Sequence, residues 1–307
     1  LYFLRKIDKI MIKDSEEEHF IQCTLCNSTK LKVLKKYEKD YLVKCKSCKF
    51  IFSSKIPTSS ELDQIYNNYS RGNEITKLTR IKNKKLAETI LSFNPSIKSC
   101  LDIACGEGNL LEAFGELNVQ INGTEHESGK SQLIEKGINF IEGEFFPITD
   151  KKFDLIIFTE AIEHINDQNK FLKHAVNHLN SGGLIYMTTP NVNSLEKRIL
   201  RSGWGMFVYP EHLSYYSPKT INYLHSQFGL KKVLNRTENI SVYRLVEYFN
   251  SFYKKKHSDN YDPISTSNKI QDMTSNNFFL NAVKGVINFL LNLFGLGTSL
   301  ITLYRKP

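Results

Sequence analysis

An apolar segment that runs into two closely spaced glycines is the feature that most limits how this chain can fold. Residues 97–104 read IKSCLDIA, which is typical of a buried β-strand, and GEGNLLEAF follows directly. Gly106 and Gly108 let the backbone turn tightly and leave room for a ligand beside the first turn of a helix. The segment therefore predicts a strand, a glycine loop and a helix, with a small molecule at the loop.

The residues around the two glycines narrow the choice of ligand. A dinucleotide fingerprint needs a third glycine where Leu111 stands, and a phosphate-binding P-loop needs Lys and Ser or Thr where Asn109 and Leu110 stand. The loop is acidic instead, with Asp102 before it and Glu107 within it. Carboxylates disfavour a pyrophosphate and suit a ligand that carries an ammonium group and one carboxylate. A nicotinamide-binding sheet with an atypical loop is the alternative.

Further strand-like segments alternate with helical ones along the chain. After the first strand, the expected strands are QINGTEHES, INFIEGEFF, KKFDLIIFTE, GGLIYMTTPN, KKVLNRTENISVY and the final SLITLYRKP, which we expect to pair antiparallel beside the sixth. Helical patterns cover residues 128–136 and 168–179. This alternation predicts an α/β fold with a doubly wound, mostly parallel, seven-stranded sheet. A ligand then lies at the carboxyl ends of the first and second strands, where Glu125 is placed to accept hydrogen bonds from a ribose.

Two cysteine pairs precede this region. Cys23 and Cys26 form one C-x2-C, Cys45 and Cys48 form another, and 18 residues separate the pairs. Two such turns complete a tetrahedral cage of four thiolates, which suits Zn²⁺ and predicts a zinc ribbon. A C-x2-C redox pair fits less well because there are two pairs. We expect the zinc to be structural, because four cysteines leave no open position and about 33 residues cannot build a core alone.

The charge balance leaves several partners open. The chain has 307 residues, a formal net charge of +9 and a pI near 9.1, which favours anionic partners such as nucleic acid, nucleotide sugars or a phospholipid surface, unless the lysines merely solvate the surface. Seven lysines belong to the ribbon: Lys30, Lys32, Lys35, Lys36, Lys44, Lys46 and Lys49. The opening LYFLRKIDKI is too short and too charged for a signal or a membrane span, and Met11 is a candidate start. Reduced thiols then indicate a cytoplasmic protein.

Two helical patterns flank the α/β region. From residue 60 to 92 the chain looks helical until Asn94 and Pro95 stop it, and the expected inward residues are Tyr66, Ile75, Leu78, Ile81, Leu86 and Ile90. Residues 278–294 read FFLNAVKGVINFLLNLF, a broad apolar helix with a narrow polar stripe, too short to span a bilayer. We interpret this helix as a core helix, a lid, a dimer contact or a peripheral membrane contact at the inner membrane surface.

The motifs are similar, in chain order, to those of the class I S-adenosylmethionine-dependent methyltransferases: LDIACGEGNLL, GTE, EGE, FDLIIFTEAIEHI, LNSGGLIYMTTPN and PEHLSYYSPKTINYLHSQFGL. The resemblance covers about residues 98–234. Within the class, EAIEHI and TPN…H resemble the ubiquinone-biosynthesis O-methyltransferases and the small-RNA 3′-end 2′-O-methyltransferases. A zinc module ahead of the core resembles the sugar C-methyltransferases and proteins of surface-glycan gene clusters, although the C-terminal domain of the sugar C-methyltransferases is lacking.

The resemblance assigns roles to the residues at the strand ends. It implies that Asp102, Gly106 and Gly108 hold the methionine part of S-adenosylmethionine and that Glu125 holds the ribose. It further implies that Glu144 contacts the adenine amino group, with the Phe145 backbone beside it. The implied organisation is a tail (1–19), a zinc ribbon (20–55), a helical linker and cap (56–95), a cofactor-binding catalytic core (96–240), and a polar insertion, amphipathic helix and last strand (241–307).

A second set of residues is expected where the acceptor binds. TEAIEH places Glu160, Glu163 and His164 at i, i+3 and i+4, on one face if the segment is helical, and His212 joins them from YPEHLSYY. These four either hold Mg²⁺ or Mn²⁺, which orients an acceptor hydroxyl, or leave His164 as a general base without metal. Otherwise Glu163 and His164 only hold the turn together.

The acceptor itself is open at this stage. Five aromatic residues from the same region either line an acceptor wall or pack on the sheet: Trp204, Phe207, Tyr209, Tyr215 and Tyr216. We expect a small-molecule, sugar or glycan-precursor, or lipid-linked acceptor that is methylated at a hydroxyl oxygen. The alternative is an RNA methyltransferase whose basic ribbon grips phosphates.

Overall fold

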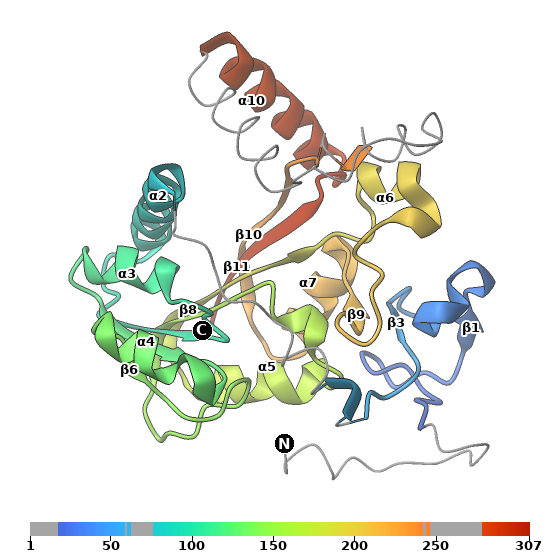
Figure 1. The fold of residues 1–307 in the computed structure, drawn as a ribbon, viewed down its shortest axis with the longest axis horizontal. Helices are drawn as coiled ribbons and strands as arrows, with labels where there is room; N and C mark the ends of the chain where they lie inside the picture. Colours follow the sequence, from blue (N-terminus) through green and yellow to red (C-terminus); the bar gives the residue numbers. More distant parts are fainter. Residues whose placement is uncertain (1–17, 59, 63–75, 242–243, 246–277) are drawn as a thin grey trace, which may run out of the picture.

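A seven-stranded sheet forms the centre of the molecule in the computed structural model, which describes residues 18–58, 60–62, 76–241, 244–245 and 278–307 (Figure 1). In spatial order the strands are β10 (Lys231–Glu238), β11 (Ser299–Arg305), β8 (Leu179–Pro190), β7 (Phe153–Thr159), β4 (Ser99–Ile103), β5 (Gln120–Thr124) and β6 (Asn139–Phe140). β11 is antiparallel to both of its neighbours, and the other pairs are parallel. The predicted doubly wound sheet is therefore confirmed.

Helices cover both faces of this sheet. One face packs against α2 (Lys77–Phe93), α3 (Asn109–Gly115) and α4 (Lys130–Glu135). The other face packs against α5 (Gln168–Asn177), α7 (Pro218–Ser226) and the cysteine-rich segment. Within β7, Leu155 and Ile157 enter the first core while Ile156 and Phe158 enter the second. Strands buried on both faces read as continuous apolar runs, which explains why this strand could be predicted from sequence.

The cysteine-rich segment belongs to a second, four-stranded antiparallel sheet. Its strands are β1 (Leu31–Val33), β2 (Leu42–Cys45), β3 (Ile51–Ser53) and β9 (Ser214–Tyr215), and a 3-10 helix, η2 (Lys35–Asp40), joins β1 to β2. β9 comes from the C-terminal half of the chain, and the sequence did not predict it. Phe50 and Phe52 are buried in the same core as Tyr216 and the central sheet. The ribbon therefore obtains its apolar core from the α/β body.

The predicted helix over residues 60–92 is observed only in part. α2 begins after Thr76, whose hydroxyl accepts a hydrogen bond from the Thr79 N–H, and it ends at Asn94 as expected. Tyr66 and Ile75 lie outside the described residues. Ile81 was expected to face inward, but it is 55% exposed. It stands nine residues before the buried Ile90, which is half a turn around the helix, so it lies on the opposite side.

The helix predicted near the C-terminus is α10 (Phe278–Leu293), and its polar side faces the protein. The side-chain oxygens of Asn288 and Asn292 accept hydrogen bonds from the Asn239 and Thr237 N–H groups, at the end of β10. Among its described side chains Leu291 is buried, whereas Phe289 and Leu293 are 66% and 64% exposed. The prediction that this segment is a core helix is therefore wrong for the described side chains of α10, most of which are exposed. Within the described residues, no helix has the length and apolar content to cross a bilayer.

Candidate active site

The glycine loop leaves the carboxyl end of β4 in a strained but open conformation. Ala104, Gly106 and Gly108 have φ values of 56°, 56° and 73°, in the left-handed region. A Cβ on Gly108 would lie 2.2 Å from Ile138 Cδ1, so this glycine is required for packing as well as for its backbone angle. A Cβ on Gly106 would meet nothing within 4 Å. The loop is thus closed on the Gly108 side and accessible to a ligand on the Gly106 side.

Two carboxylates lie beside this loop. Asp102 is buried, and its Oδ1 has no hydrogen-bond partner among the described residues. Burial, and secondly the charge of Glu125, raises the pKa of Asp102 to about 7. Glu125 follows β5, and its Oε2 accepts a hydrogen bond of 2.8 Å from the Gly106 N–H. A buried carboxylate oxygen without a partner suits a ligand that brings an ammonium group.

The segment after β6 lies against the end of β5. The Thr124 hydroxyl donates a hydrogen bond to the Glu144 carbonyl oxygen, while the half-buried Phe145 packs against the core. The structure therefore gathers the predicted cofactor residues at one edge of the sheet, at or after the carboxyl ends of β4, β5 and β6. Their contacts with a cofactor stay predictions.

Three of the four predicted acceptor-site residues converge next to this edge. Ligand atoms of Glu163, His164 and His212 all lie within 4.8 Å of one another. Glu163 and His164 belong to a 3-10 turn, η4 (Ile162–His164), directly after β7, whereas His212 comes from the loop before β9. Since β7 is the parallel neighbour of β4, the turn η4 and the glycine loop both leave the sheet at its carboxyl-end edge.

Backbone carbonyls fix the tautomers of both imidazoles. His164 Nδ1 lies 2.8 Å from the Glu211 carbonyl oxygen, and His212 Nδ1 lies 2.9 Å from that of Met206. A carbonyl only accepts, so each Nδ1 carries the hydrogen and each neutral ring keeps a lone pair on Nε2. Burial, with the charge of His212, lowers the pKa of His164 to about 4, so this ring is neutral at pH 7.

Glu163 is held by a residue that sequence analysis did not single out. Its side chain is 1% exposed, and the Thr189 hydroxyl donates a 2.9 Å hydrogen bond to Oε2. Oε1 has no partner among the described residues. Burial, and then repulsion from Glu160, raises the pKa of Glu163. Thr189 lies in the TTPN motif at the end of β8. The only sequence signal for its role is that this motif ends a strand expected next to the one that precedes Glu163.

Glu160 departs from the expected geometry. The prediction placed it on one helical face with Glu163 and His164, but η4 starts only at Ile162 and Glu160 adopts a left-handed φ of 49°. Its carboxylate is not among the three mutually close ligand groups, and the residue is exposed at the end of β7. The shared helical face is therefore wrong, because the backbone reverses at Glu160 before the turn forms.

The aromatic residues of the same region are mostly part of the core. Trp204, Phe207 and Tyr215 belong to one buried cluster, and Tyr216 belongs to the core beneath the sheet. Tyr209 is half-buried, and its ring lies 4.9 Å from that of Tyr41 in the ribbon. The prediction that Trp204, Phe207, Tyr215 and Tyr216 line an acceptor wall is therefore wrong. These four residues pack in the protein core, which was the alternative.

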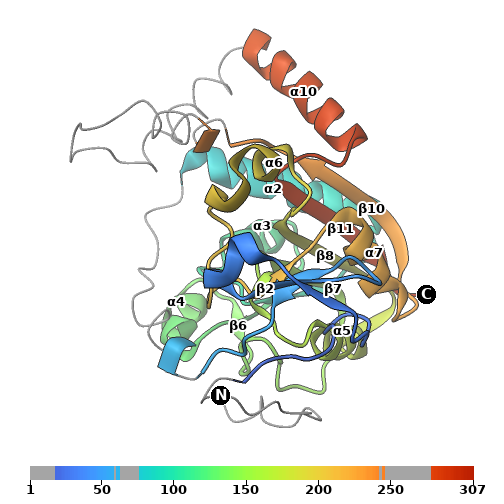
Figure 2. The same cartoon turned by 90° about the vertical axis from the view of Figure 1, so that its right-hand side faces the viewer.

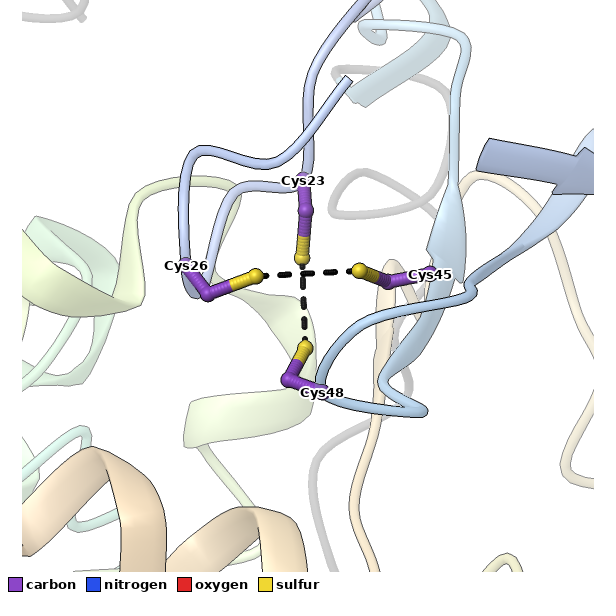
Figure 3. Close-up of side chains that lie close together, drawn as sticks. All are labelled: Cys23, Cys26, Cys45 and Cys48. Carbon is purple, nitrogen blue, oxygen red and sulfur yellow. Dashed lines mark hydrogen bonds between the residues drawn. The ribbon is translucent and has the colours of Figure 1, made fainter. Parts of the chain in front are cut away.

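The four ribbon cysteines point toward a common centre (Figure 3). The Sγ atoms of Cys23 and Cys48 are 3.6 Å apart, as are those of Cys26 and Cys45, and the four thiols are free. Sulfurs at about 2.3 Å from a tetrahedral Zn²⁺ would be roughly 3.8 Å apart, and a disulfide would need about 2.05 Å. The donor set therefore fits zinc and excludes a disulfide pairing.

A run of backbone hydrogen bonds links the ribbon to the acceptor-site residues. The Ser53 N–H of β3 donates to the Leu213 carbonyl at 2.8 Å, and the Leu213 N–H donates to the Glu163 carbonyl at 2.8 Å. Leu213 directly follows His212. The ribbon thus holds the loop that brings His212 to Glu163.

Comparison with known families identifies the α/β region. A family model described as "Methyltransferase domain" matches residues 76–235, which is just over half of the chain. The ubiquinone biosynthesis O-methyltransferase of Bradyrhizobium sp. (strain ORS 278) is 30% identical over 138 residues, which cover 38% of this chain and 54% of that protein. The mitochondrial enzyme of the same name from Saccharomyces cerevisiae is 28% identical over 160 residues, 48% of this chain and 49% of its own.

The chain spans about half the length of these curated relatives. Among solved structures, a SAM-dependent methyltransferase from Archaeoglobus fulgidus is similar over 74% of this chain and 94% of its own, with 16% identity and a TM-score of 0.47.

Asp102→Asn should stabilise the ligand-free protein at high pH. The native pKa of about 7 lies above the ordinary value of 3.8, so the native state holds a proton that the unfolded state releases, and the free energy of unfolding falls as pH rises between about 4 and 7. Asn removes this loss. We expect its melting temperature to exceed that of the wild type by more at pH 8 than at pH 5.

Asp154→Asn is the matched control. Burial opposes ionisation of Asp154, but four hydrogen bonds from Asn180, Lys98 and Ser99 outweigh it and lower the pKa. Its stabilisation is therefore already present at pH 5, and the variant should lose similar stability at both pH values. If the gain in melting temperature of Asp102→Asn were the same at pH 5 and pH 8, the raised pKa of Asp102 would be contradicted.

Proposed function

The chain belongs to the family of S-adenosylmethionine-dependent methyltransferase domains, and we propose that it methylates a hydroxyl oxygen of a small-molecule acceptor. The observation that carries this proposal is the convergence of Glu163, His164 and His212 after β7, whose neighbour β4 leads into the glycine loop. Methyl transfer from a sulfonium needs an aligned acceptor oxygen and a group that assists loss of its proton. In this proposal the three side chains orient the acceptor oxygen and assist the loss of its proton.

The chain's own residues would hold the cofactor by charge. Asp102 offers its unpartnered Oδ1 to the ammonium group of the methionine part, and the open side of Gly106 lets the cofactor approach the backbone. Glu125 accepts a hydrogen bond from the Gly106 N–H at the end of β5, and in this proposal its carboxylate also accepts hydrogen bonds from the ribose hydroxyls. Glu144 and Phe145 would border the adenine.

The acceptor site fits a divalent cation such as Mg²⁺ or Mn²⁺. Two imidazoles whose other nitrogens donate to backbone carbonyls, and a buried carboxylate whose Oε1 has no partner among the described residues, form a mixed nitrogen and oxygen donor set, which suits Mn²⁺ better than Mg²⁺. Glu160 is close enough to repel Glu163, but its carboxylate is not among the three mutually close ligand groups. Such an ion, when bound, lowers the pKa of an acceptor hydroxyl and fixes its direction. Without it, His164 Nε2 is the general base.

The relatives favour a small acceptor over RNA. Both curated relatives are named as ubiquinone biosynthesis O-methyltransferases, so each acts at an oxygen. A sugar, a glycan precursor or a lipid-linked intermediate remains within this class. The RNA methyltransferase alternative receives no support from these names.

S-adenosylhomocysteine should bind the purified protein and raise its melting temperature, because a ligand of the native state alone stabilises it by about 2.7 kcal/mol at 100 times Kd. Asp102→Asn should weaken this binding in calorimetry while remaining folded. NADH serves as the control ligand and should leave the melting temperature unchanged. Stabilisation by NADH without stabilisation by S-adenosylhomocysteine would overturn the proposed function.

Mn²⁺ should bind at the Glu163, His164 and His212 site with one ion per chain, measured as loss of the free-ion signal in electron paramagnetic resonance. Glu163→Gln removes a ligand charge while keeping the Thr189 contact and should weaken binding roughly 10–100-fold or more. Glu211→Gln is the control, because only the backbone of Glu211 contacts His164.

The general-base alternative gives the opposite pattern. If Mn²⁺ does not bind, chelation leaves methyl transfer unchanged, and His164→Ala is far more damaging than Glu160→Ala or His212→Ala, the ion is excluded and His164 acts alone.

We also propose that the ribbon holds one structural zinc. Elemental analysis of the purified chain should find about one zinc per molecule. Cys23→Ser should give insoluble or protease-sensitive protein, since metal binding supplies folding energy to so small a module. Cys105→Ser, which changes a cysteine outside the cage, should keep the metal. Absence of zinc even after zinc is added during expression would reject the site.

A further inference from the structure

One face of the ribbon sheet carries lysines next to its apolar contact with the α/β body. The strand register places Lys32, Lys44, Ile51 and Tyr215 side by side across β1, β2, β3 and β9. Side chains in one such row point to the same face of a sheet. Ile51 and Tyr215 are buried on this face, so Lys44 extends from the edge of an apolar contact.

That face is turned toward α6 (Leu195–Leu200) and the 3-10 turn η5 (Arg201–Gly203). Ile51 and Tyr215 share one cluster with Leu200 and Trp204, and the ring of Tyr37 in η2 lies 4.8 Å from that of Phe207. Figures 1 and 2 both show α6 beside the ribbon. The junction is therefore lined by ribbon residues on one side and by the segment that leads to His212 on the other.

Lys197 of α6 lies close enough to Lys44 at this junction for the two charges to repel, and Arg198 directly follows Lys197. Burial lowers the pKa of Lys197, and the positive charges of Lys44 and Arg198 lower it further. Lys44 and Lys197 are half-buried, and Arg198 is exposed. The fold thus places two further positive charges near Lys197 and partly removes Lys44 and Lys197 from water.

No acidic side chain neutralises this group within the described part of the chain. Lys44, Lys197 and Arg198 take part in no ion pair there. Glu196, the acidic residue of α6, is fully buried and turned away: Arg244 and the Thr298 hydroxyl contact its carboxylate at 3.1 and 2.8 Å. A cluster of like charges without a counter-charge is the usual form of an anion site.

We propose that Lys44, Lys197 and Arg198 form a binding site for the phosphate or diphosphate group of the acceptor. This inference rests on the proposed function and specifies its substrate class. α6 follows β8 at the same edge of the sheet as Glu163, and one continuous segment, residues 195–213, carries Lys197, Arg198 and His212. A phosphorylated acceptor would thus be held at the ribbon junction while its hydroxyl reaches the acceptor-site residues. The ribbon contributes a binding residue as well as structure.

The test measures binding of inorganic pyrophosphate by calorimetry, with the zinc-containing full chain. We expect one site per chain, and Lys44→Gln and Lys197→Gln should each weaken binding by about tenfold, the usual effect of losing one charge-assisted hydrogen bond. Lys173→Gln is the matched control, because Lys173 is an exposed lysine on α5 outside the junction and its loss changes the net charge equally.

Two further probes separate the sources of the phosphate. Uridine diphosphate that binds more tightly than pyrophosphate, with the same loss in Lys197→Gln, would assign a soluble nucleotide-linked acceptor. Vesicles containing phosphatidylglycerol that bind the wild type but not Lys44→Gln would assign a lipid-linked one. Either result supports binding of a phosphate or diphosphate group at this site.

Other outcomes reject the site. Absence of pyrophosphate binding, or equal binding by all three variants and the wild type, would overturn the proposal. So would a single-stranded RNA that binds far more tightly than uridine diphosphate, since that would indicate a nucleic-acid surface. S-adenosylhomocysteine is titrated into the same samples. If it binds while pyrophosphate does not, only the phosphate site fails; if it does not bind, the proposed function itself fails.

Discussion

The pairing of β3 with β9 is the contact on which the acceptor side of the molecule depends. Two register pairs, Ile51 with Tyr215 and Phe52 with Ser214, join strands about 160 residues apart in sequence. Through Leu213 this pairing fixes His212 against Glu163. It also sets the ribbon face that carries Lys44 against α6. The cysteine cage shapes the ribbon, but the pairing of β3 with β9 connects the ribbon to the loop that carries His212.

The cofactor side could be predicted from sequence because its geometry is local. A strand, a glycine loop and a helix follow one another within about 20 residues, and each residue type is dictated by its immediate backbone: Gly108 has no space for a side chain, and Asp102 ends a buried strand. The mostly parallel, doubly wound sheet followed from the alternation of strands and helices. The hydrophobic runs in β4, β7 and β8 are long enough to be identified as buried strands from sequence.

The acceptor side could not be predicted from sequence, because its geometry depends on contacts between segments that are far apart in the chain. β9 has two residues and no hairpin partner nearby, so nothing in its sequence indicates pairing with a segment at residue 51. Glu160 was assigned to a helical face, but its spacing from Glu163 does not reveal the backbone reversal between them. Thr189 and Lys197 acquire their roles only from tertiary contacts. Likewise the asparagines of α10 face the body because β10 offers N–H groups there, which no periodicity shows.

These differences divide the molecule into two functional halves with different physical supports. On its Gly108 side the glycine loop packs on the core that contains α2, α3 and α4, whereas Ala104 packs on the other core, which the ribbon shares. His212, the Glu163 backbone and the cation cluster all depend on the ribbon and its strand pairing. A perturbation of the ribbon therefore alters the geometry of the acceptor half most directly, while the packing of Gly108 against Ile138 is left in place. Cofactor binding and acceptor choice are thus only partly separable in this fold, because the core that the ribbon shares also supports one side of the glycine loop.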